Sequence, residues 1–225
     1  MVVTGLGVVS PNATNVREFD AALQAGRSGI AFIPELRELD FGCQVGGEPP
    51  LTSEQRQEVQ KKYRLVKLKN NGVLYGVMAG MEAWEHSGLQ QASKDDPPLF
   101  NMGCVFGAGA LGVDIYDYAV PQVRSGNVKR QGSRLVLEAM NSATASFLTQ
   151  YIGFGNWVGS NSSACSTGTE ALALAYRHIQ DGRADVMLAG SCETDGPIIW
   201  SVFDSLRALQ RSYNDTPEQA SRPLS

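Results

Sequence analysis

Asn161-Ser162-Ser163-Ala164-Cys165-Ser166-Thr167-Gly168-Thr169-Glu170 is the stretch around which this chain is organised. Residues 156–160 before it have the composition of a short strand, and apolar residues at helical spacing follow it over 171–179. Gly182 then suits the left-handed position that ends a helix. Cys165 is therefore predicted to lie where a strand turns into the N-terminus of a helix.

That position favours a nucleophilic role for Cys165. Unsatisfied N–H groups and the positive end of the helix dipole favour a thiolate over a thiol. The residues around Cys165 are small, so a substrate carbonyl could approach its sulfur closely. A free cysteine is more often an inert core residue, however. The spacing alone leaves both interpretations open.

The composition is that of a globular protein. The chain has 225 residues, of which 43% are hydrophobic and 19% charged. This length is enough for one sizeable core or two small ones. The net charge of -4 gives no electrostatic signature of nucleic-acid or anionic-membrane binding. No run of roughly 18 apolar residues occurs, so no membrane span is expected.

The N-terminus and the cysteines indicate a reducing, cytoplasmic setting. Residues 1–10 lack a basic region and are interpreted as a first core strand, not a signal peptide. The cysteines show no CxxC spacing and no nearby histidine, so neither a disulfide framework nor a metal site is expected. These four cysteines are Cys43, Cys104, Cys165 and Cys192.

Strands alternate with helices along the chain, which predicts an α/β domain with a largely parallel sheet. No linker marks a domain boundary, so residues 1–225 are treated as one domain, and 125–132 is predicted to be a basic loop. The predicted strands cover 2–9, 102–106, 156–160 and 184–190. The predicted helices cover 15–26, 52–63, 71–87, 113–124, 134–140, 143–151, 171–179 and 197–209.

A competing motif lies at 107–112, where Gly-Ala-Gly-Ala-Leu-Gly matches the dinucleotide pattern G-x-G-x-x-G after a strand. That pattern requires a second strand ending in Asp or Glu about 20 residues later, and the sequence has a polar loop there. The interpretation preferred here is that the glycines let backbones pack closely. No cofactor is expected.

Neither histidine is a suitable base for Cys165. His178 follows it by 13 residues on the same predicted helix, about 20 Å away at the helical rise. His86 lies near the end of another predicted helix. Both are predicted to be ordinary surface or capping residues, so the base for a catalytic Cys165 would come from elsewhere.

In their order along the chain, several motifs resemble those of the β-ketoacyl-[acyl-carrier-protein] synthases, including the polyketide ketosynthases. The resemblance covers essentially the entire chain and centres on the active-site cysteine signature Ser-Ser-Ala-Cys-Ser-Thr-Gly at 162–168. The other matching segments are 2–11, 24–30, 107–109, 185–190, 207–209 and 213–223.

This resemblance implies the N-terminal half of a layered αβαβα thiolase-like fold, in a protein that dimerises. It makes Cys165 the nucleophile that takes an acyl chain from an acyl carrier protein, with its own N–H in the oxyanion hole. Decarboxylation of a malonyl thioester on the carrier would supply the carbanion that attacks this acyl-enzyme. Ala110 and Phe203 match positions near the acyl pocket, and a small residue at 110 would leave room for a longer or bulkier chain. Residues 137–145 match the region that meets the dimer partner, in a homodimer or a ketosynthase-like heterodimer.

The sequence also departs from the pattern of this family. The family places its two catalytic histidines, a lysine and a second oxyanion N–H in a C-terminal half, and this sequence stops at Ser225. The chain is then a piece of a longer enzyme, a fragment completed by another chain, or a half-length protein, and the first two are favoured. A non-catalytic partner similar to a chain-length factor is the alternative, although such partners usually lack the cysteine. A related acyltransferase that does not decarboxylate is a weaker third interpretation.

Overall fold

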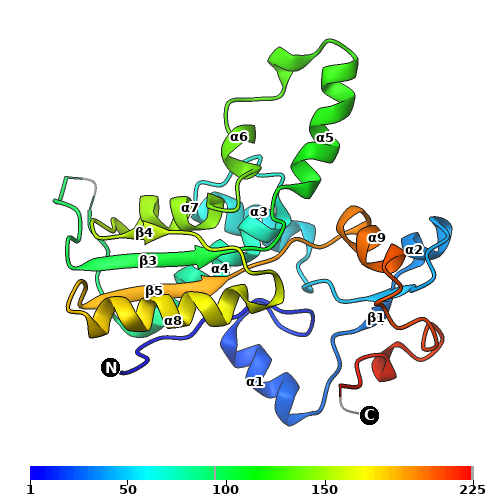
Figure 1. The fold of residues 1–225 in the computed structure, drawn as a ribbon, viewed down its shortest axis with the longest axis horizontal. Helices are drawn as coiled ribbons and strands as arrows, with labels where there is room; N and C mark the ends of the chain where they lie inside the picture. Colours follow the sequence, from blue (N-terminus) through cyan, green and yellow to red (C-terminus); the bar gives the residue numbers. More distant parts are fainter. Residues whose placement is uncertain (94, 224–225) are drawn as a thin grey trace. The chain divides into compact units, whose positions relative to one another are not determined.

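The computed structural model describes residues 1–93 and 95–223 (Figure 1). The chain divides into two compact units. Unit 1 combines Met1–Gly7 with Glu54–Thr194, and unit 2 combines Val8–Ser53 with Asp195–Ser225.

A parallel three-stranded sheet forms the centre of unit 1. Its strand order is β4 (Val158–Gly159), β3 (Met102–Gly107) and β5 (Val186–Ser191). Both neighbours run parallel to β3, which confirms the predicted parallel α/β arrangement. Residues 103–107 of β3 are buried, as expected for a strand that is covered on both faces.

Helices cover both faces of this sheet. On one face, Val105 packs against Ala171 and Ala175 of α8 (Thr167–Gln180). Side chains alternate between the faces of a strand, so Cys104 and Phe106 point to the opposite face. Helices α4 (Asn71–Ser87) and α7 (Ala143–Ile152) pack against the sheet and against each other there. The predicted bounds of α4 are confirmed, including its end at Gly88, which has a φ of 72°.

A stripe of glycines lets α4 approach its neighbours closely. Gly72, Gly76 and Gly80 are four residues apart and therefore share one face of the helix. A methyl group added at Gly76 would lie 2.7 Å from the Thr144 Cγ2 atom, and one at Gly80 would lie 2.7 Å from a Leu148 methyl. The close packing of α4 on α7 therefore depends on the absence of side chains along this stripe.

Residues 113–140 form an extension of unit 1 that we call the arm. It consists of α5 (Val113–Arg124), the 3₁₀ turn η1 (Val128–Arg130) and the short helix α6 (Leu135–Glu138) (Figure 1). The predicted bounds of α5 are confirmed, whereas the helix predicted over 134–140 is reduced to a single turn. Unit 1 also contains α3 from Glu54 onward; the helix spans Ser53–Lys62.

Unit 2 contains a small antiparallel ribbon and several short helices. Strands β1 (Ala31–Phe32) and β2 (Val45–Gly46) pair with each other. The helices are α1 (Val16–Gln24), α2 (Pro34–Glu38) and α9 (Pro197–Ser205), and η3 (Pro217–Gln219) is a 3₁₀ turn. Asn15 caps the start of α1, where its side chain accepts the Glu18 N–H.

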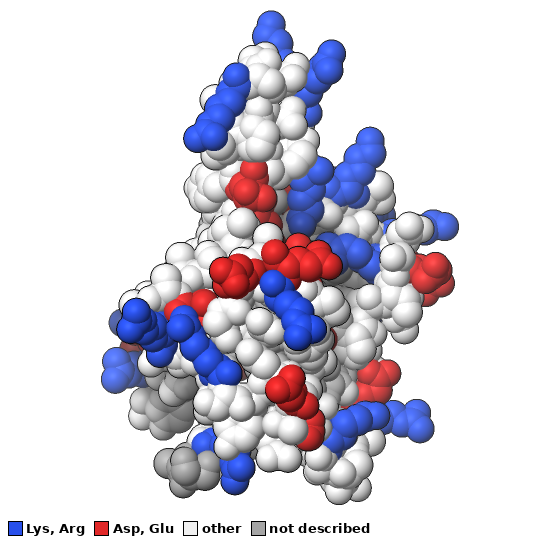
Figure 2. Space-filling view, turned by 90° about the vertical axis from the view of Figure 1, so that its right-hand side faces the viewer, with Lys and Arg blue, Asp and Glu red and all other residues white. Residues whose placement is uncertain are grey.

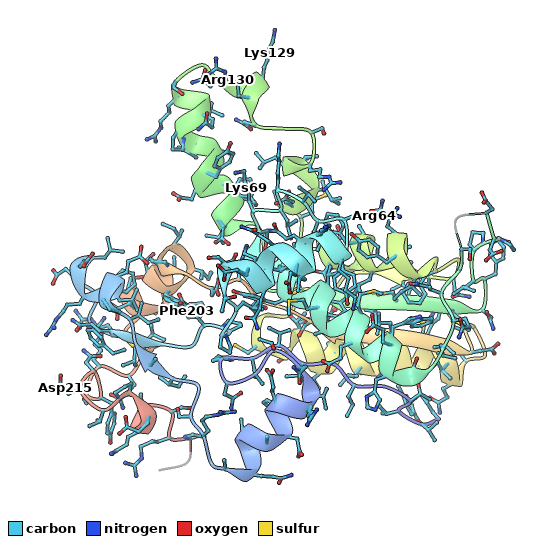
Figure 3. The ribbon with its side chains drawn as sticks, turned by 180° about the vertical axis from the view of Figure 1, so that it is seen from behind. Arg64, Lys69, Lys129, Arg130, Phe203 and Asp215 are labelled. Carbon is cyan, nitrogen blue, oxygen red and sulfur yellow. The ribbon has the colours of Figure 1, made fainter. Side chains whose placement is uncertain are left out.

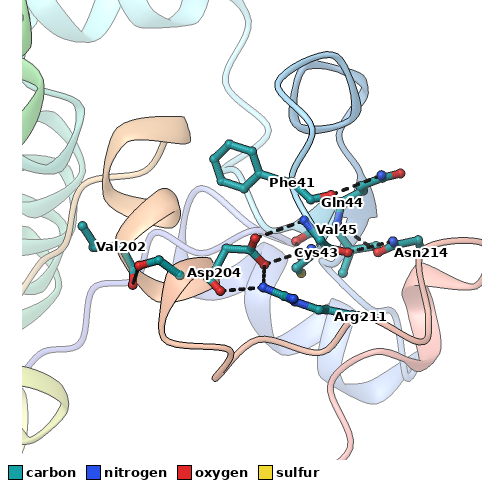
Figure 4. Close-up of polar contacts among 10 residues, drawn as sticks. Phe41, Cys43, Gln44, Val45, Val202, Asp204, Arg211 and Asn214 are labelled. Atoms are coloured by element: carbon teal, nitrogen blue, oxygen red, sulfur yellow. Dashed lines mark hydrogen bonds and ion pairs between the residues drawn. The ribbon is translucent and has the colours of Figure 1, made fainter.

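Asp204 joins distant segments of unit 2 (Figure 4). Its carboxylate accepts the N–H groups of Gly42 and Cys43, both at 3.0 Å, and pairs with Arg211 at 3.1 Å. Burial raises the pKa of Asp204, but these hydrogen bonds and the Arg211 guanidinium outweigh burial and bring that pKa below its usual value. Asn214 adds a second link, because it accepts the Gln44 N–H and donates to the Gly42 carbonyl.

The strand predicted at 2–9 is wrong. Met1, Val2 and Val3 are 70–81% exposed, and the segment pairs with no strand in the described part of the chain. Gly5 and Gly7 lie directly against α4, since a methyl group added there would come within 2.0 Å of the Ala83 and Ala79 carbonyl oxygens. A helix offers no ladder of free N–H and C=O groups, so the segment packs on α4 without forming a strand.

The packing of α7 on α4 gives a stability prediction. Leu148 is completely buried, whereas Leu172 on α8 is 60% exposed. We expect Leu148→Ala to lower the free energy of unfolding by about 2–5 kcal/mol, because it removes buried methyl groups and leaves a cavity. Leu172→Ala should change it by no more than about 0.5 kcal/mol. Urea denaturation of both variants checks this; equal losses would contradict the packing described.

The Asp204 links give a pH prediction. A carboxyl whose pKa is lowered in the folded state stabilises the fold above its unfolded pKa, about 3.9, and this contribution is lost as the pH falls through the folded pKa. We expect Asp204→Asn to reduce the free energy of unfolding at pH 7 by about 1–3 kcal/mol. As the pH falls below 4 and through the lowered pKa of Asp204, the free energies of unfolding of wild type and variant should converge. Asp215→Asn is the matched control, and its free energy of unfolding should equal that of the wild type at pH 7 and below pH 4.

Candidate active site

Cys165 lies in the 3₁₀ turn η2 (Ala164–Ser166), directly before α8. The predicted placement between a strand and the N-terminus of a helix is therefore confirmed. Cys165 is exposed, whereas Cys43, Cys104 and Cys192 are buried. Burial raises the pKa of the Cys104 thiol to about 12. Burial likewise raises the pKa of Cys192 to about 12, although a hydrogen bond with Thr144 lowers it in part.

The turn that carries Cys165 has an unusual backbone conformation at the preceding residue. Ala164 has a φ of 50°, in the left-handed region that costs a residue with a side chain about 1–2 kcal/mol. Thr167, 1% exposed, holds this turn from both sides. Its hydroxyl donates to the Ala164 carbonyl at 2.7 Å and accepts the Ser163 N–H at 2.8 Å. The strain at Ala164 is thus offset by contacts to a buried side chain.

Asn161 and Glu170 tie the same loop to the first turns of α8. The Asn161 side-chain amide donates to the Thr167 carbonyl and to the Glu170 carboxylate, both at 2.9 Å. Ser163 also donates to Glu170. These hydrogen bonds from Ser163 and Asn161 bring the pKa of Glu170 below its usual value, which keeps that carboxylate charged.

The backbone at Cys165 offers a hydrogen-bond donor. Its N–H makes no hydrogen bond within residues 1–93 and 95–223. An exposed thiol therefore stands beside an unused N–H at the N-terminal end of α8. Such a pair can attack a carbonyl carbon and stabilise the negative charge that develops on the carbonyl oxygen.

Ala110 lies in the turn after β3, next to the Cys165 loop. Asn141 holds the two together: its side-chain amide donates to the Ala108 and Gly109 carbonyls and, at 3.4 Å, to the Ser162 hydroxyl. Ser162 also donates to the Gly109 carbonyl at 3.3 Å. Sequence reasoning missed Asn141, because one Asn between two helical segments carries no distinctive signal.

The glycines at 107–112 let backbone segments pack closely, which is the interpretation that the sequence favoured. A methyl group added at Gly107 would lie 2.4 Å from the Asn161 carbonyl oxygen, and one at Gly112 would lie 2.2 Å from that of Ala139. In addition, Glu193 accepts the Gly109 N–H at 2.7 Å and the Ala110 N–H at 3.3 Å. A carboxylate of the chain itself thus occupies N–H groups that a dinucleotide phosphate would need.

The remaining candidate residues lie elsewhere. Phe203 belongs to unit 2, where it is on α9 and 42% exposed (Figure 3). His86 is exposed, and its Nδ1 accepts the Leu6 N–H at 3.2 Å. His178 is half-buried near the far end of α8, where it contacts Asn156 and the Trp157 ring. Unit 1 therefore brings together Cys165 and the turn that carries Ala110, and leaves both histidines outside this group.

The described part of the chain, residues 1–93 and 95–223, contains neither a metal-binding cluster nor a membrane-spanning helix. No three His, Cys, Asp or Glu side chains gather there in a way that could hold a metal ion. No helix among these residues has both the length and the apolar character needed to cross a membrane.

Comparison with known proteins gives consistent matches. Residues 1–224 match the model of the family described as beta-ketoacyl synthase, N-terminal domain. The chain is 32% identical over 224 residues to 3-oxoacyl-[acyl-carrier-protein] synthase 1 of Haemophilus influenzae, covering 98% of this chain and 53% of the relative. It thus spans about half the length of the curated relatives it matches.

Solved structures of ketosynthases also match this chain. The crystal structure of a beta-ketoacyl synthase from Burkholderia phymatum superposes with a TM-score of 0.83 at 26% identity, covering 99% of this chain and 53% of the other. The AntDE:AntF complex, a type II polyketide synthase acyl-carrier protein with its ketosynthase bound to the hexaketide, gives 0.77 at 25% identity. That match covers 93% of this chain and 49% of the other.

The contrast between the cysteines gives a labelling prediction. Alkylation requires an accessible thiolate, so burial and a raised pKa protect Cys104 and Cys192. We expect iodoacetamide to label Cys165 alone in the folded protein and all four cysteines in denaturant, as read by peptide mass spectrometry. The Cys165→Ala variant should take up no label while folded. Labelling of another cysteine at a similar rate in folded wild type would contradict the structure.

Proposed function

This chain belongs to the β-ketoacyl synthase family, and we propose that it supplies the acyl-accepting part of a ketosynthase active site. The fold is the one that the resemblance implies, the N-terminal half of the thiolase-like α/β architecture. The proposed reaction is a decarboxylative Claisen condensation, in fatty acid or polyketide synthesis.

The observation that carries this proposal is the setting of Cys165. Of the four cysteines, it alone is exposed. The left-handed Ala164 and the buried Thr167 fix the turn that presents it, and its own N–H has no partner in the described residues. An inert core cysteine needs none of these features.

In the first step, the Cys165 thiolate attacks the carbonyl carbon of an acyl thioester on the carrier. The Cys165 N–H donates a hydrogen bond to the carbonyl oxygen and stabilises the negative charge that develops there. Collapse of the tetrahedral intermediate breaks the carbon–sulfur bond to the carrier. The acyl group is then on the Cys165 sulfur, and the carrier thiolate takes up the proton that the Cys165 thiol released.

In the second step, a malonyl thioester on the carrier loses CO₂, and the electron pair left on carbon attacks the acyl carbonyl on Cys165. The new carbon–carbon bond gives a 3-oxoacyl carrier and frees the Cys165 thiolate. The family resemblance assigns this decarboxylation to groups of a C-terminal half. We therefore propose that residues 1–225 act as an N-terminal domain and condense only when that half is present.

Ala110 and Phe203 are proposed to border the acyl pocket. The Ala110 turn is hydrogen-bonded to the Cys165 loop through Gly109 and Ser162. The small side chain of Ala110 would leave space for a longer or bulkier acyl chain. The AntDE:AntF structure, in which a ketosynthase binds its carrier, supports an acyl carrier protein as the partner. The homodimer or heterodimer and the cytoplasmic setting stay predictions.

Acyl transfer can be tested on this chain directly. Incubation with an acyl carrier protein thioester should add the mass of one acyl group, because the first step needs only Cys165 and a nearby donor. Intact mass spectrometry detects the adduct. It should be absent from Cys165→Ala and present in Cys43→Ala, which removes a buried thiol in unit 2.

Two outcomes would contradict the proposal. A chain that folds but gains no acyl group would favour a non-catalytic partner of a ketosynthase. If the adduct forms and the 225-residue chain alone also condenses it with malonyl carrier, the proposed dependence on a C-terminal half is wrong.

A further inference from the structure

Glu193 holds the turn that carries Ala110. It follows β5, which lies beside β3 in the sheet, and the turn follows β3 (Figure 1). One oxygen of its carboxylate accepts the Gly109 N–H at 2.7 Å, and the other accepts the Ala110 N–H at 3.3 Å. A carboxylate suits this pair of donors, because it offers two acceptor oxygens and no hydrogen. A glutamine would direct an amide NH₂ group at one of the two N–H groups.

The backbone on both sides of Glu193 is fixed by buried neighbours. The preceding residue, Cys192, is 9% exposed and hydrogen-bonds through its sulfur to the Thr144 hydroxyl at 3.2 Å. The following residue, Thr194, is 8% exposed and donates to the Asp114 carboxylate at 2.6 Å. The Glu193 side chain therefore extends from a rigid support, so it can set the position of the turn.

The contacts of the Glu193 carboxylate are confined to this turn. In residues 1–93 and 95–223 it forms no ion pair and no hydrogen bond other than those to the Gly109 and Ala110 N–H groups. The absence of a side chain at Gly109 lets the carboxylate approach, because a methyl group there would lie 2.9 Å from its nearer oxygen. Asp204 in unit 2 differs, since it also pairs with Arg211.

Asn141 holds the same turn from another side, and the comparison shows what is particular to Glu193. The Asn141 side chain accepts the Leu111 N–H at 3.1 Å and donates to two carbonyl groups of the turn. It also donates to Ser162 in the loop that carries Cys165. Glu193 makes no hydrogen bond to that loop in the described residues. A substitution of Glu193 can therefore release the turn while the contacts of the Cys165 loop stay in place.

We propose that Glu193 is a positioning residue that sets the acyl-chain selectivity of Cys165 through the Ala110 turn. The role rests on the proposed function, in which Ala110 borders the acyl pocket. A pocket wall discriminates between acyl chains only if it resists displacement when a longer chain presses on it. The two hydrogen bonds that Glu193 accepts supply this resistance, because hydrogen bonds to a charged acceptor are stronger than those between neutral groups.

Amide hydrogen exchange of the 225-residue chain tests the hold on the turn without any acyl transfer. We expect the Gly109 and Ala110 N–H groups to exchange about tenfold or more faster in Glu193→Ala, because an amide exchanges when its hydrogen bond opens. Glu193→Gln should accelerate one of the two amides less, since its carbonyl oxygen can still accept one N–H. The amides of β3 should keep their wild-type rates. Unchanged exchange in the turn, or equal acceleration in β3, would overturn the proposal.

Acylation rates test the role in selectivity. We expect carrier thioesters of butyrate, octanoate, dodecanoate and hexadecanoate to acylate wild-type Cys165 at different rates, and this spread to narrow about fivefold or more in Glu193→Ala. Glu193→Gln should restore part of the spread. Ala110→Leu should change the spread less in Glu193→Ala than in wild type, because the two residues act through one turn. Iodoacetamide should label Cys165 in Glu193→Ala at the wild-type rate, since its loop is not released.

Glu58 provides the matched control. Acidic side chains occur at several places on the surface (Figure 2), and Glu58 is an exposed one on α3. Glu58→Ala removes the same charge and the same side chain as Glu193→Ala. It should leave both the exchange rates of the turn and the spread of acylation rates unchanged.

The outcomes separate this role from the proposed function. A wild type that accepts acyl groups at equal rates for all four chains would overturn the role of Glu193, as would an unchanged spread in Glu193→Ala or an equal narrowing in Glu58→Ala. Strictly additive effects of Ala110→Leu and Glu193→Ala would do so too, because the two residues would then act independently. A wild type that gains no acyl group would overturn the proposed function and with it the selectivity role, even where hydrogen exchange confirms the hold on the turn.

Discussion

Parallel pairing of β3 with both β4 and β5 is the constraint on which the candidate active site depends. Because the strands run in one direction, the segments after them meet at the same edge of the sheet. These segments carry the Ala110 turn, the Cys165 loop and Glu193. Residues separated by more than 80 positions in the sequence thereby come within hydrogen-bond distance, as Gly109 and Glu193 show. Cys165 lies directly before the N-terminus of α8, where its backbone N–H has no hydrogen-bond partner in the described residues.

Carboxylates that accept backbone N–H groups recur through the molecule. Glu193 holds the turn after β3, Glu138 holds the segment before α4, and Asp204 holds residues 42–43 of unit 2. In each case a charged side chain fixes an irregular segment that has no regular partner of its own.

The sequence predicted the regular elements of unit 1 well, because their signals are local. The bounds of α4 and α5 follow from helical periodicity, caps and breakers, and the position of Cys165 follows from a strand, a small-residue turn and a helix in succession. The N-terminal segment was predicted wrongly, because an apolar run alone does not specify the neighbouring strand that pairing requires, and its first residues are exposed. Thr167 and Asn141 were missed as organising residues, because their hydrogen bonds depend on contacts that only the folded chain creates. The roles of Cys165, Ala110 and Phe203 stay predictions.

We propose that the turn before α8 presents Cys165 and its own N–H to an acyl thioester. A crystal structure of the chain after incubation with an acyl carrier protein thioester tests this most directly. We expect continuous density from the Cys165 sulfur to an acyl group, with the carbonyl oxygen about 3 Å from the Cys165 backbone nitrogen. An acyl group bound to Cys165 with its carbonyl oxygen turned away from that N–H, or an acyl group on a different residue, would contradict it.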